Sequence, residues 1–333
     1  MKILFAGSPS IAVTSLEALC DSAEFELAGV LTNPDTPRGR HGDAQPTDVG
    51  EAALKNRVTQ ILKPVKLDGD AREQVSALKP DLLVSFAYGK IFGPKFLSTF
   101  PMGGINIHPS LLPRYRGPTP IQAAILNRDT ETGITIQWLA KEMDCGDIIT
   151  QEKFQLTGKE TQNTLGEIVS GKAARMMIDT LRKIEAGNAD GIPQNHPDIK
   201  IETSYCKMIS KEDGVIGWNE SALSIEAKIR AFDPWPLCRT MHNGRELLIL
   251  KADMFEGGGA SKEALNEGLP GEVLGFDKNC GILIRTGKGI LAVTQLQYQA
   301  KKALFWRDFL NGARDFTGTE NCRTRLGVSH QNN

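Results

Sequence analysis

The sequence predicts two domains, a doubly wound, Rossmann-like α/β domain followed by a smaller domain of short β-strands. The chain has 333 residues, which is more than one ordinary domain usually contains. Residues 2–32 hold an apolar run, a helical pattern and a second apolar run, the β-α-β unit that opens a doubly wound sheet. Residues 246–296 instead hold short apolar runs with glycine between them, which is typical of a small β-barrel.

The overall charge of the chain provides no long-range attraction to nucleic acid. Lys and Arg number 39 and Asp and Glu number 40, so the formal net charge is −1. Hydrophobic residues make up 40% of the chain and charged residues 24%, which is typical of a soluble globular protein. Binding to a polyanion would therefore depend on a local basic patch.

Cysteine spacing and hydropathy together predict a cytoplasmic protein. The six cysteines are scattered without a C-x-x-C pair, as in reduced intracellular proteins, and no cysteine–histidine spacing suggests a metal site. No apolar run reaches the ~18 residues that a membrane-spanning helix needs. The apolar start ends at Gly7-Ser8-Pro9 and acidic residues follow, so residues 2–6 are predicted to be a strand and not a signal peptide.

Apolar runs and helix breakers predict the elements of the first domain. A helix carrying Ile11, Leu16 and Leu19 should follow the first strand. Residues 33–48 are rich in Pro, Gly and charge and should form a long loop. Residues 109–120 contain four prolines, which excludes helix and central strand and predicts a rigid surface segment. The other predicted elements are strands at 25–32, 81–86, 104–108 and 133–139 and a helix at 164–186.

The second domain is predicted to contain one helix, a group of strands and a closing helix. Asn219 should cap the first helix, which should end before Asp233-Pro234. Gly287-Lys288-Gly289 suits a hairpin turn. The predicted strands are 246–252, 271–276, 281–286 and 290–296, and the closing helix carries Leu304, Trp306, Phe309 and Leu310.

Polar side chains gather at the carboxyl ends of two predicted strands. Asn106 and His108 are two residues apart on one strand, so their side chains point to the same face. Asp144 follows the next strand and is expected at the same crevice, where ligands of α/β sheets bind. Asn-x-His pairs and aspartates at the end of a sheet also occur as structural residues, so the spacing alone leaves both interpretations open.

An Asn, a His and an Asp together suit the transfer of an acyl group to an amine. Attack on the carbonyl carbon creates a tetrahedral oxyanion, which an Asn amide and a protonated imidazole can stabilise. A carboxylate can orient the imidazole and move protons from the attacking amine to the leaving nitrogen. Neither Ser nor Cys occurs in a nucleophile-elbow context, which favours direct transfer over a covalent intermediate.

Three motifs lie in and directly beside the proline-rich stretch at 109–120. They are Asn106 to Pro113, Arg116-Gly117 and Pro120-Ile121-Gln122. Together they resemble the signature of the folate-dependent formyltransferases. The resemblance implies that Asn106, His108 and Asp144 are catalytic and that 10-formyltetrahydrofolate is the co-substrate, with no metal. It also implies two folate-contacting segments. One contains Ser110, Leu111, Leu112 and Pro113, and the other contains Phe86, Tyr88, Gly89 and Ile91.

Motifs in the second half resemble landmarks of one branch of this family, the branch that formylates methionyl-tRNA. They are Tyr205 to Glu212, Ile216-Gly217-Trp218 and residues 229–236, 271–274 and 299–304. The resemblance implies a catalytic domain at 1–189, a linker at 190–206 and an OB-like tRNA-binding domain at 207–330. The implied reaction is direct formyl transfer to the α-amino group of methionyl-initiator tRNA, for translation initiation, by a monomeric enzyme.

Local charge agrees with a tRNA partner. Residues 278–333 contain nine basic and three acidic residues, so their net charge is +6 (9 − 3), and they include Lys301 and Lys302. Basic side chains bind phosphates by counterion exchange, although such a run also suits a solvated face. The loop with Arg38 and Arg40 resembles the family insertion that reaches the acceptor stem. Residues 41–45 replace the lysine pair that the family usually has there, so the basis of initiator discrimination stays open.

Three other functions remain compatible with these motifs. A related formyltransferase could act on the amine of a sugar nucleotide, since such enzymes also pair this catalytic domain with a barrel. A formyltetrahydrofolate hydrolase would release formate to water from the same three residues. A tRNA-binding protein with a silent catalytic domain is the third, and the intact trio argues against it.

Overall fold

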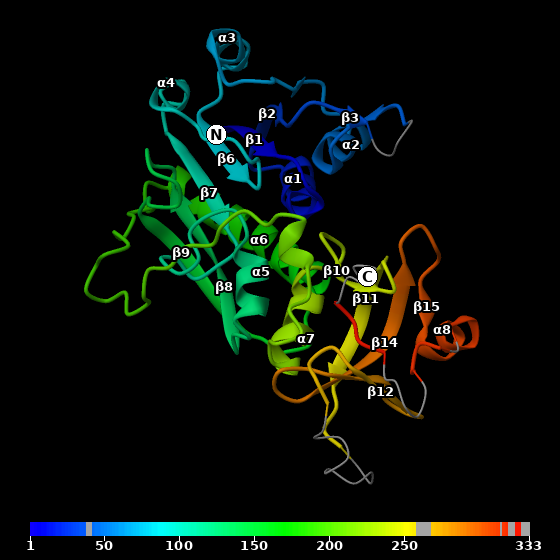
Figure 1. Cartoon of the computed structure of the whole chain (residues 1–333). Coiled ribbons are helices and arrows are strands. Elements are labelled where there is room, and N and C mark those ends of the chain that lie inside the picture. The colour runs from blue at the N-terminus through cyan, green and yellow to red at the C-terminus, as the bar shows by residue number, and fades with distance from the viewer. Residues whose placement is uncertain (38–41, 258–267, 314, 319–323, 328–333) are drawn as a thin grey trace. The chain divides into compact units, whose positions relative to one another are not determined.

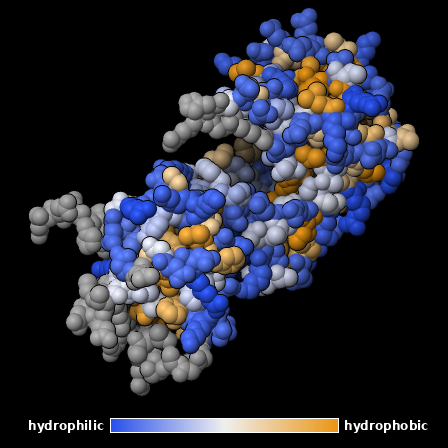
Figure 2. All heavy atoms as spheres, turned by 90° about the vertical axis from the view of Figure 1, so that its right-hand side faces the viewer, coloured by the Kyte–Doolittle hydropathy of each residue, from blue (hydrophilic) through white to orange (hydrophobic). Residues whose placement is uncertain are grey.

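The computed structural model describes residues 1–37, 42–257, 268–313, 315–318 and 324–327 (Figure 1). The chain divides into two compact units. The first consists of Met1–Ile121, Thr130–Leu156 and Thr164–Met208, and the second of Gln122–Asp129, Thr157–Asn163 and the chain from Ile209 onward. No helix among the described residues is long and apolar enough to cross a membrane. The face drawn in Figure 2 is largely hydrophilic with scattered hydrophobic residues, as is normal for a protein surface.

The first unit is built on a seven-stranded sheet in the order β5-β2-β1-β6-β7-β8-β9. The first five strands in that order are parallel, and β8 and β9 are antiparallel to their neighbours. This arrangement confirms the doubly wound α/β fold. The strands are β1 Lys2–Gly7, β2 Glu26–Leu31, β5 Ile61–Leu62, β6 Leu82–Phe86, β7 Gly104–His108, β8 Glu131–Trp138 and β9 Ile148–Gln155.

Helices of the first unit occur where apolar residues recur at helical spacing. The predicted helix at 164–186 is α6, Gln162–Glu185, and its buried residues include Leu165, Val169 and Leu181. The shorter helices are η1 Ser10–Ala12, α1 Val13–Cys20, α2 Asp48–Lys55, α3 Gly69–Ala77 and α4 Pro94–Leu97, while α5 Pro120–Leu126 begins in the first unit.

Strand register places three loops at one edge of this sheet. Gly7 on β1 pairs with Phe86 on β6, and Phe86 pairs with Ile107 on β7. The carboxyl ends of these strands are therefore level, and strand order reverses between β1 and β6. Ligands of doubly wound sheets bind at such a switch point.

The predicted loop at 33–48 is closed at its base by polar contacts. The hydroxyl groups of Thr32 and Thr47 are 2.5 Å apart, and Asn33 Nδ2 donates to Ser8 Oγ at 2.9 Å. Two short strands, β3 Thr36–Pro37 and β4 Ala44–Gln45, pair within the loop. Arg38 and Arg40, predicted to contact tRNA, lie outside the described residues.

The proline-rich segment at 109–120 differs from its prediction in one respect. It forms neither a strand nor a helix until α5 begins at Pro120, as expected. The prediction of a surface position was wrong, because Ser110 and Leu112 are fully buried. Thr135 on β8 explains the burial, since its hydroxyl donates to Ser110 O at 2.7 Å and accepts from Leu112 N at 3.1 Å.

Residues 190–206, expected to be a linker, pack on the first unit. Ile192 and Ile148 exchange two backbone hydrogen bonds of 2.8 Å. Arg116 N donates to Ser204 O at 2.9 Å, and Cys206 N donates to Arg116 O at 2.8 Å. The chain that leaves α6 therefore returns to the loop that follows β7.

The second unit contains an antiparallel sheet, as expected. Its path is β10-β11-β14-β13-β12, with β15 paired to β14. The strands are β10 Cys238–His242, β11 Arg245–Met254, β12 Val273–Asp277, β13 Gly281–Arg285, β14 Ile290–Tyr298 and β15 Leu304–Phe305. The sequence pattern missed β10 and β15.

Three helical segments accompany this sheet: η2 Glu212–Gly214, α7 Ala222–Ala231 and α8 Trp306–Gly312. The predicted cap of α7 was wrong by two residues. Ser221 is the N-cap, and its hydroxyl accepts a hydrogen bond from Ser224 N at 3.1 Å. The helix ends at Ala231, with Phe232 as its C-cap, before Asp233-Pro234, as expected.

Candidate active site

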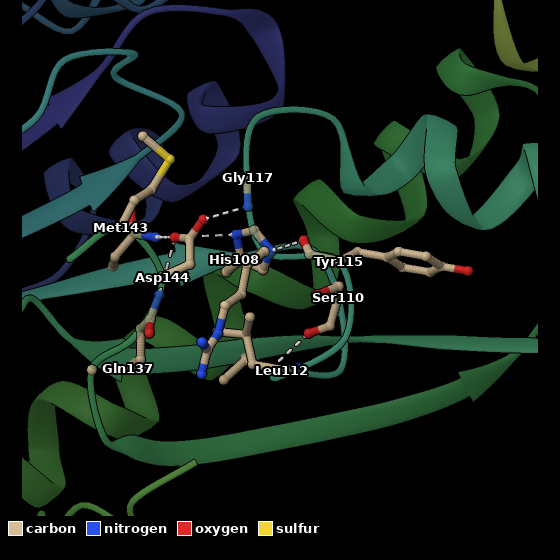
Figure 3. A network of polar contacts seen from close by, with 12 residues as sticks. His108, Ser110, Leu112, Tyr115, Gly117, Gln137, Met143 and Asp144 are labelled. Carbon is tan, nitrogen blue, oxygen red and sulfur yellow. Dashed lines mark hydrogen bonds and ion pairs between the residues drawn. The ribbon is translucent and has the colours of Figure 1, made fainter. Parts of the chain in front are cut away.

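The three predicted catalytic side chains converge beside β7 of the first sheet, and Figure 3 shows His108 and Asp144 facing each other. Asn106 and His108 lie on β7, two residues apart, and therefore on the same face. Asp144 lies in the loop between β8 and β9. Its φ is +55°, in the left-handed region that residues other than glycine rarely adopt. Such a backbone persists only where its surroundings hold it.

Asp144 is the centre of the polar contacts. Its Oδ1 lies 3.5 Å from His108 Nδ1 and 3.5 Å from Asn106 Nδ2, and accepts from Gln137 Nε2 at 3.2 Å. Its Oδ2 accepts from Gly117 N at 2.8 Å. Both carboxylate oxygens thus face hydrogen-bond donors of the protein.

The ring of His108 is held on both sides. Its Nε2 lies 2.9 Å from the Tyr115 carbonyl oxygen, which can only accept, so Nε2 carries a proton. Nδ1 faces Asp144, so a proton taken up by this ring would lie between the two side chains. Both ring nitrogens therefore already have protein partners. Asn106, in contrast, uses one amide hydrogen for the long contact to Asp144 and keeps the other for a ligand.

We expect His108 to titrate below the usual range of a histidine. Burial lowers the pKa of the His108 imidazole from 6.5, and Asp144 and the Tyr115 carbonyl oppose the shift. The neutral ring, which can accept a proton, therefore persists to lower pH than in a free histidine. Removing the charge in Asp144→Asn should lower the pKa of His108 further. NMR titration of the His108 ring in both proteins measures this, and a higher midpoint in Asp144→Asn would contradict the assigned pairing.

The folate-contacting segment predicted at Ser110 to Pro113 is anchored beside this site. Ser110 Oγ donates to Arg114 O at 2.6 Å, and Gln151 Nε2 donates to Leu112 O at 3.0 Å. Ser110, Leu112 and Pro113 are buried, and Leu111 is partly exposed. The segment is thus held by its backbone against β8 and β9.

The second predicted segment follows β6 and is divided between core and surface. Phe86 and Tyr88 are 0% and 2% exposed, and the Tyr88 ring stacks on Phe92. Gly89 has φ = +83°, and Ile91 is 65% exposed. The side chains of Phe86 and Tyr88 therefore pack in the core beneath the loop, while Gly89 and Ile91 are available to a ligand.

The predicted RNA contacts belong to the second unit and to the loop at 33–48. Lys301 and Lys302 are exposed, between β14 and β15. The described residues contain no group of three or more His, Cys, Asp or Glu side chains arranged to hold a metal ion.

Sequence reasoning missed two glutamines at the site, Gln137 and Gln194. Gln137 lies on β8 directly opposite Asn106 and is 2% exposed, and Gln194 is 7% exposed in the segment expected to be a linker. A glutamine inside the apolar run at 133–139 was the available signal for Gln137. Nothing in the local pattern marked Gln194.

Comparison with known proteins shows the family to which this chain belongs. Residues 1–181 match the family model Formyl transferase, and residues 208–314 match Formyl transferase, C-terminal domain. The chain belongs to the formyltransferase family. The two matches together cover both compact units of this formyltransferase.

Curated relatives resemble the formyltransferase along nearly its whole length. The methionyl-tRNA formyltransferase of Treponema denticola is 48% identical over 324 residues, covering 95% of this chain and 98% of that protein. The methionyl-tRNA formyltransferase of Treponema pallidum (strain Nichols) is 41% identical, covering 94% of this chain and 97% of that protein.

Solved structures share the fold of the formyltransferase. An N-formyltransferase from Helicobacter canadensis, in complex with folinic acid and dTDP-3-aminofucose, has a TM-score of 0.61 and 22% identity, covering 88% of this chain and 99% of that one. HypX from Aquifex aeolicus, in complex with tetrahydrofolic acid, has a TM-score of 0.60 and 18% identity, covering 96% of this chain and 48% of that one. At these identities the likeness concerns the fold alone.

Proposed function

We propose that this formyltransferase transfers the formyl group of 10-formyltetrahydrofolate to the α-amino group of methionyl-initiator tRNA. The observation that carries the proposal is the 48% identity to a methionyl-tRNA formyltransferase across 95% of the chain, both units included. The convergence of Asn106, His108 and Asp144 supplies the groups that this reaction needs.

Transfer requires one bond to form and one to break at the formyl carbon. The methionine nitrogen attacks that carbon, the carbon–N10 bond of the folate breaks, and a proton passes from the amine to N10. The second amide hydrogen of Asn106 stabilises the developing oxyanion. The His108–Asp144 pair receives the amine proton and returns it to the leaving nitrogen, because its Nδ1–Oδ1 contact can hold one proton.

This assignment changes the expected role of His108. The sequence suggested that its ring donates to the oxyanion, whereas Nε2 is already bonded to Tyr115 O. In the proposed mechanism His108 handles the proton, and Asn106 is the oxyanion donor.

In this proposal the two predicted folate segments hold the flat heteroaromatic part of the co-substrate. We place the folate along the exposed parts of these segments, which are Leu111, Gly89 and Ile91. The buried Ser110, Leu112 and Pro113 fix the first segment, and Phe86 and Tyr88 fix the second. Leu111 and Ile91 provide apolar contact area.

The tRNA is assigned to residues 207–330, with Lys301 and Lys302 binding phosphates and Arg38 and Arg40 reaching the acceptor stem. Two exposed adjacent lysines suit a polyanion, since each phosphate contact releases counterions. We further propose that the enzyme acts as a monomer in the cytoplasm, where aminoacylated tRNA is available.

An acceptor assay tests the proposal. The purified protein, 10-formyltetrahydrofolate and either methionyl-initiator or methionyl-elongator tRNA are incubated, and formylmethionine is quantified after ester hydrolysis. We expect formylation of the initiator tRNA and little of the elongator. No transfer to either tRNA, with the folate still bound, would contradict the proposal and favour the amine of a sugar nucleotide as acceptor.

A further inference from the structure

A buried hydrogen-bond chain runs from Arg116 to the carboxylate of Asp144. Arg116 donates to Gln194 Oε1 from Nε at 3.0 Å and from Nη2 at 2.6 Å. Gln194 Nε2 lies 3.1 Å from Gln137 Oε1, and Gln137 Nε2 lies 3.2 Å from Asp144 Oδ1. This series of hydrogen bonds thus connects the loop after β7, the segment after α6, β8 and the loop that contains Asp144.

The direction of every hydrogen bond in this chain is fixed by chemistry. A guanidinium can only donate, so Gln194 must turn its oxygen to Arg116 and its NH2 group to Gln137. Gln137 must then turn its oxygen to Gln194 and its NH2 group to Asp144. All four bonds are donated toward the carboxylate, and hydrogen bonds aligned in this way polarise one another.

Gln194 also holds the backbone of the Asp144 loop. Its Nε2 lies 2.8 Å from Asp144 O and 2.8 Å from Gly146 O, so its two hydrogens are shared among these two carbonyl oxygens and Gln137 Oε1. Gly146 is packed tightly there, because an added Cβ would lie 1.7 Å from Trp138 O. The same amide therefore anchors the loop in which Asp144 adopts its unfavourable φ of +55°.

We infer that Gln194 is a positioning residue for formyl transfer, which sets both the backbone and the side-chain orientation of Asp144. This inference rests on the proposed function. It gives the segment at 190–206 a role in catalysis, because Gln194 reaches the reacting groups only through Gln137 and Asp144. Gln194 itself contacts none of the three predicted catalytic side chains directly.

Two substitutions distinguish positioning of Asp144 from mere attachment of the segment at 190–206. Gln194→Ala removes the contact to Arg116 and also the contacts to Gln137, Asp144 O and Gly146 O. Gln194→Glu keeps the contact to Arg116, now between opposite charges, but has no N–H to offer Gln137, Asp144 O or Gly146 O. If the residue only tethered the segment, Gln194→Glu would behave like the unchanged protein.

We expect both variants to lower kcat by about 10- to 100-fold with little change in KM for the folate, since small displacements of catalytic groups cost rates of this order. Gln155→Ala, at the exposed end of β9, is the matched control and should keep the original kcat. Normal kcat in Gln194→Glu would overturn the inference.

Amide hydrogen exchange of Gly117 provides a readout that does not depend on activity. Gly117 N donates to Asp144 Oδ2 at 2.8 Å, so displacement of Asp144 should expose it. We expect exchange at Gly117 to become at least about tenfold faster in both variants, with exchange in β14 unchanged. Unchanged protection at Gly117 would overturn the inference. Faster exchange at Gly117 in a protein that does not formylate tRNA would instead refute the proposed function alone.

Discussion

Asp144→Ala is expected to lower kcat for formyl transfer by about 10²- to 10⁴-fold, the range of positioned acid–base catalysis. Asp144 faces the buried His108 ring at 3.5 Å and is the one carboxylate that contacts it within the described part of the chain. Without it, the ring has no anionic partner to stabilise the proton received from the amine. Binding of 10-formyltetrahydrofolate should change little, because the predicted folate segments are anchored by Thr135, Gln151 and the core instead.

Single-turnover kinetics and calorimetric folate binding separate these two effects. Asp147→Ala is the matched control, since Asp147 is exposed on the same loop. The control should keep its turnover. Near-normal turnover of Asp144→Ala would remove Asp144 from the catalytic machinery.

Asn106→Ala is expected to lower kcat by about 10²- to 10³-fold, the cost of losing one oxyanion donor. Asn106 is the side chain of the trio with an amide hydrogen to spare, because both nitrogens of His108 already have partners. An interaction made only in the transition state lowers kcat and kcat/KM equally. Steady-state kinetics with both substrates measures these parameters.

Asn56→Ala serves as the control for the loss of an asparagine amide. Asn56 Nδ2 donates to Ala52 O at the end of α2, and its side chain is partly buried like that of Asn106. The control should leave both kinetic parameters unchanged. A rise in KM without a fall in kcat for Asn106→Ala would mean that Asn106 binds substrate and does not stabilise the transition state.

Much of the fold could be predicted because local patterns determine it. Continuous apolar runs indicated β6 and β7, whose residues are almost all buried, and helical spacing indicated α6. Strand alternation alone placed Asn106 and His108 on one face. Because β8 is antiparallel to β7 and ends beside the start of β7, Asp144 reaches Asn106 and His108 only through the loop that follows β8, which the sequence pattern did not determine.

The remaining features depend on contacts between distant segments. Gln194 acts on Asp144, 50 residues away in the sequence, and nothing local distinguishes it from an exposed glutamine. Burial of the segment at 109–120 depends on Thr135, and a proline count predicts rigidity but not burial. The cap of α7 was misplaced because Asn219 and Ser221 are both good N-cap residues.

The loop at 33–48 depends both on its local composition and on contacts between distant segments. Its composition predicted a loop, and its base is fixed by contacts of Thr32 and Asn33, which follow β2, with Thr47 and with Ser8, which follows β1. These contacts lie at the carboxyl edge of the parallel strands, where β7 also ends at His108. An acceptor substrate that binds to the loop would therefore approach the catalytic residues along that edge of the sheet.

The central claim is direct transfer of a formyl group to the methionyl amine, and one single-turnover experiment tests it. Enzyme in excess is mixed with 10-[¹³C-formyl]tetrahydrofolate and methionyl-initiator tRNA, quenched over time, and examined by mass spectrometry for labelled formylmethionine, free formate and labelled protein. We expect labelled formylmethionine to appear in step with tetrahydrofolate, without labelled formate or a labelled protein intermediate. Formate released in step with tetrahydrofolate would make the protein a hydrolase, and a formylated protein that decays to product would replace direct transfer with a covalent mechanism.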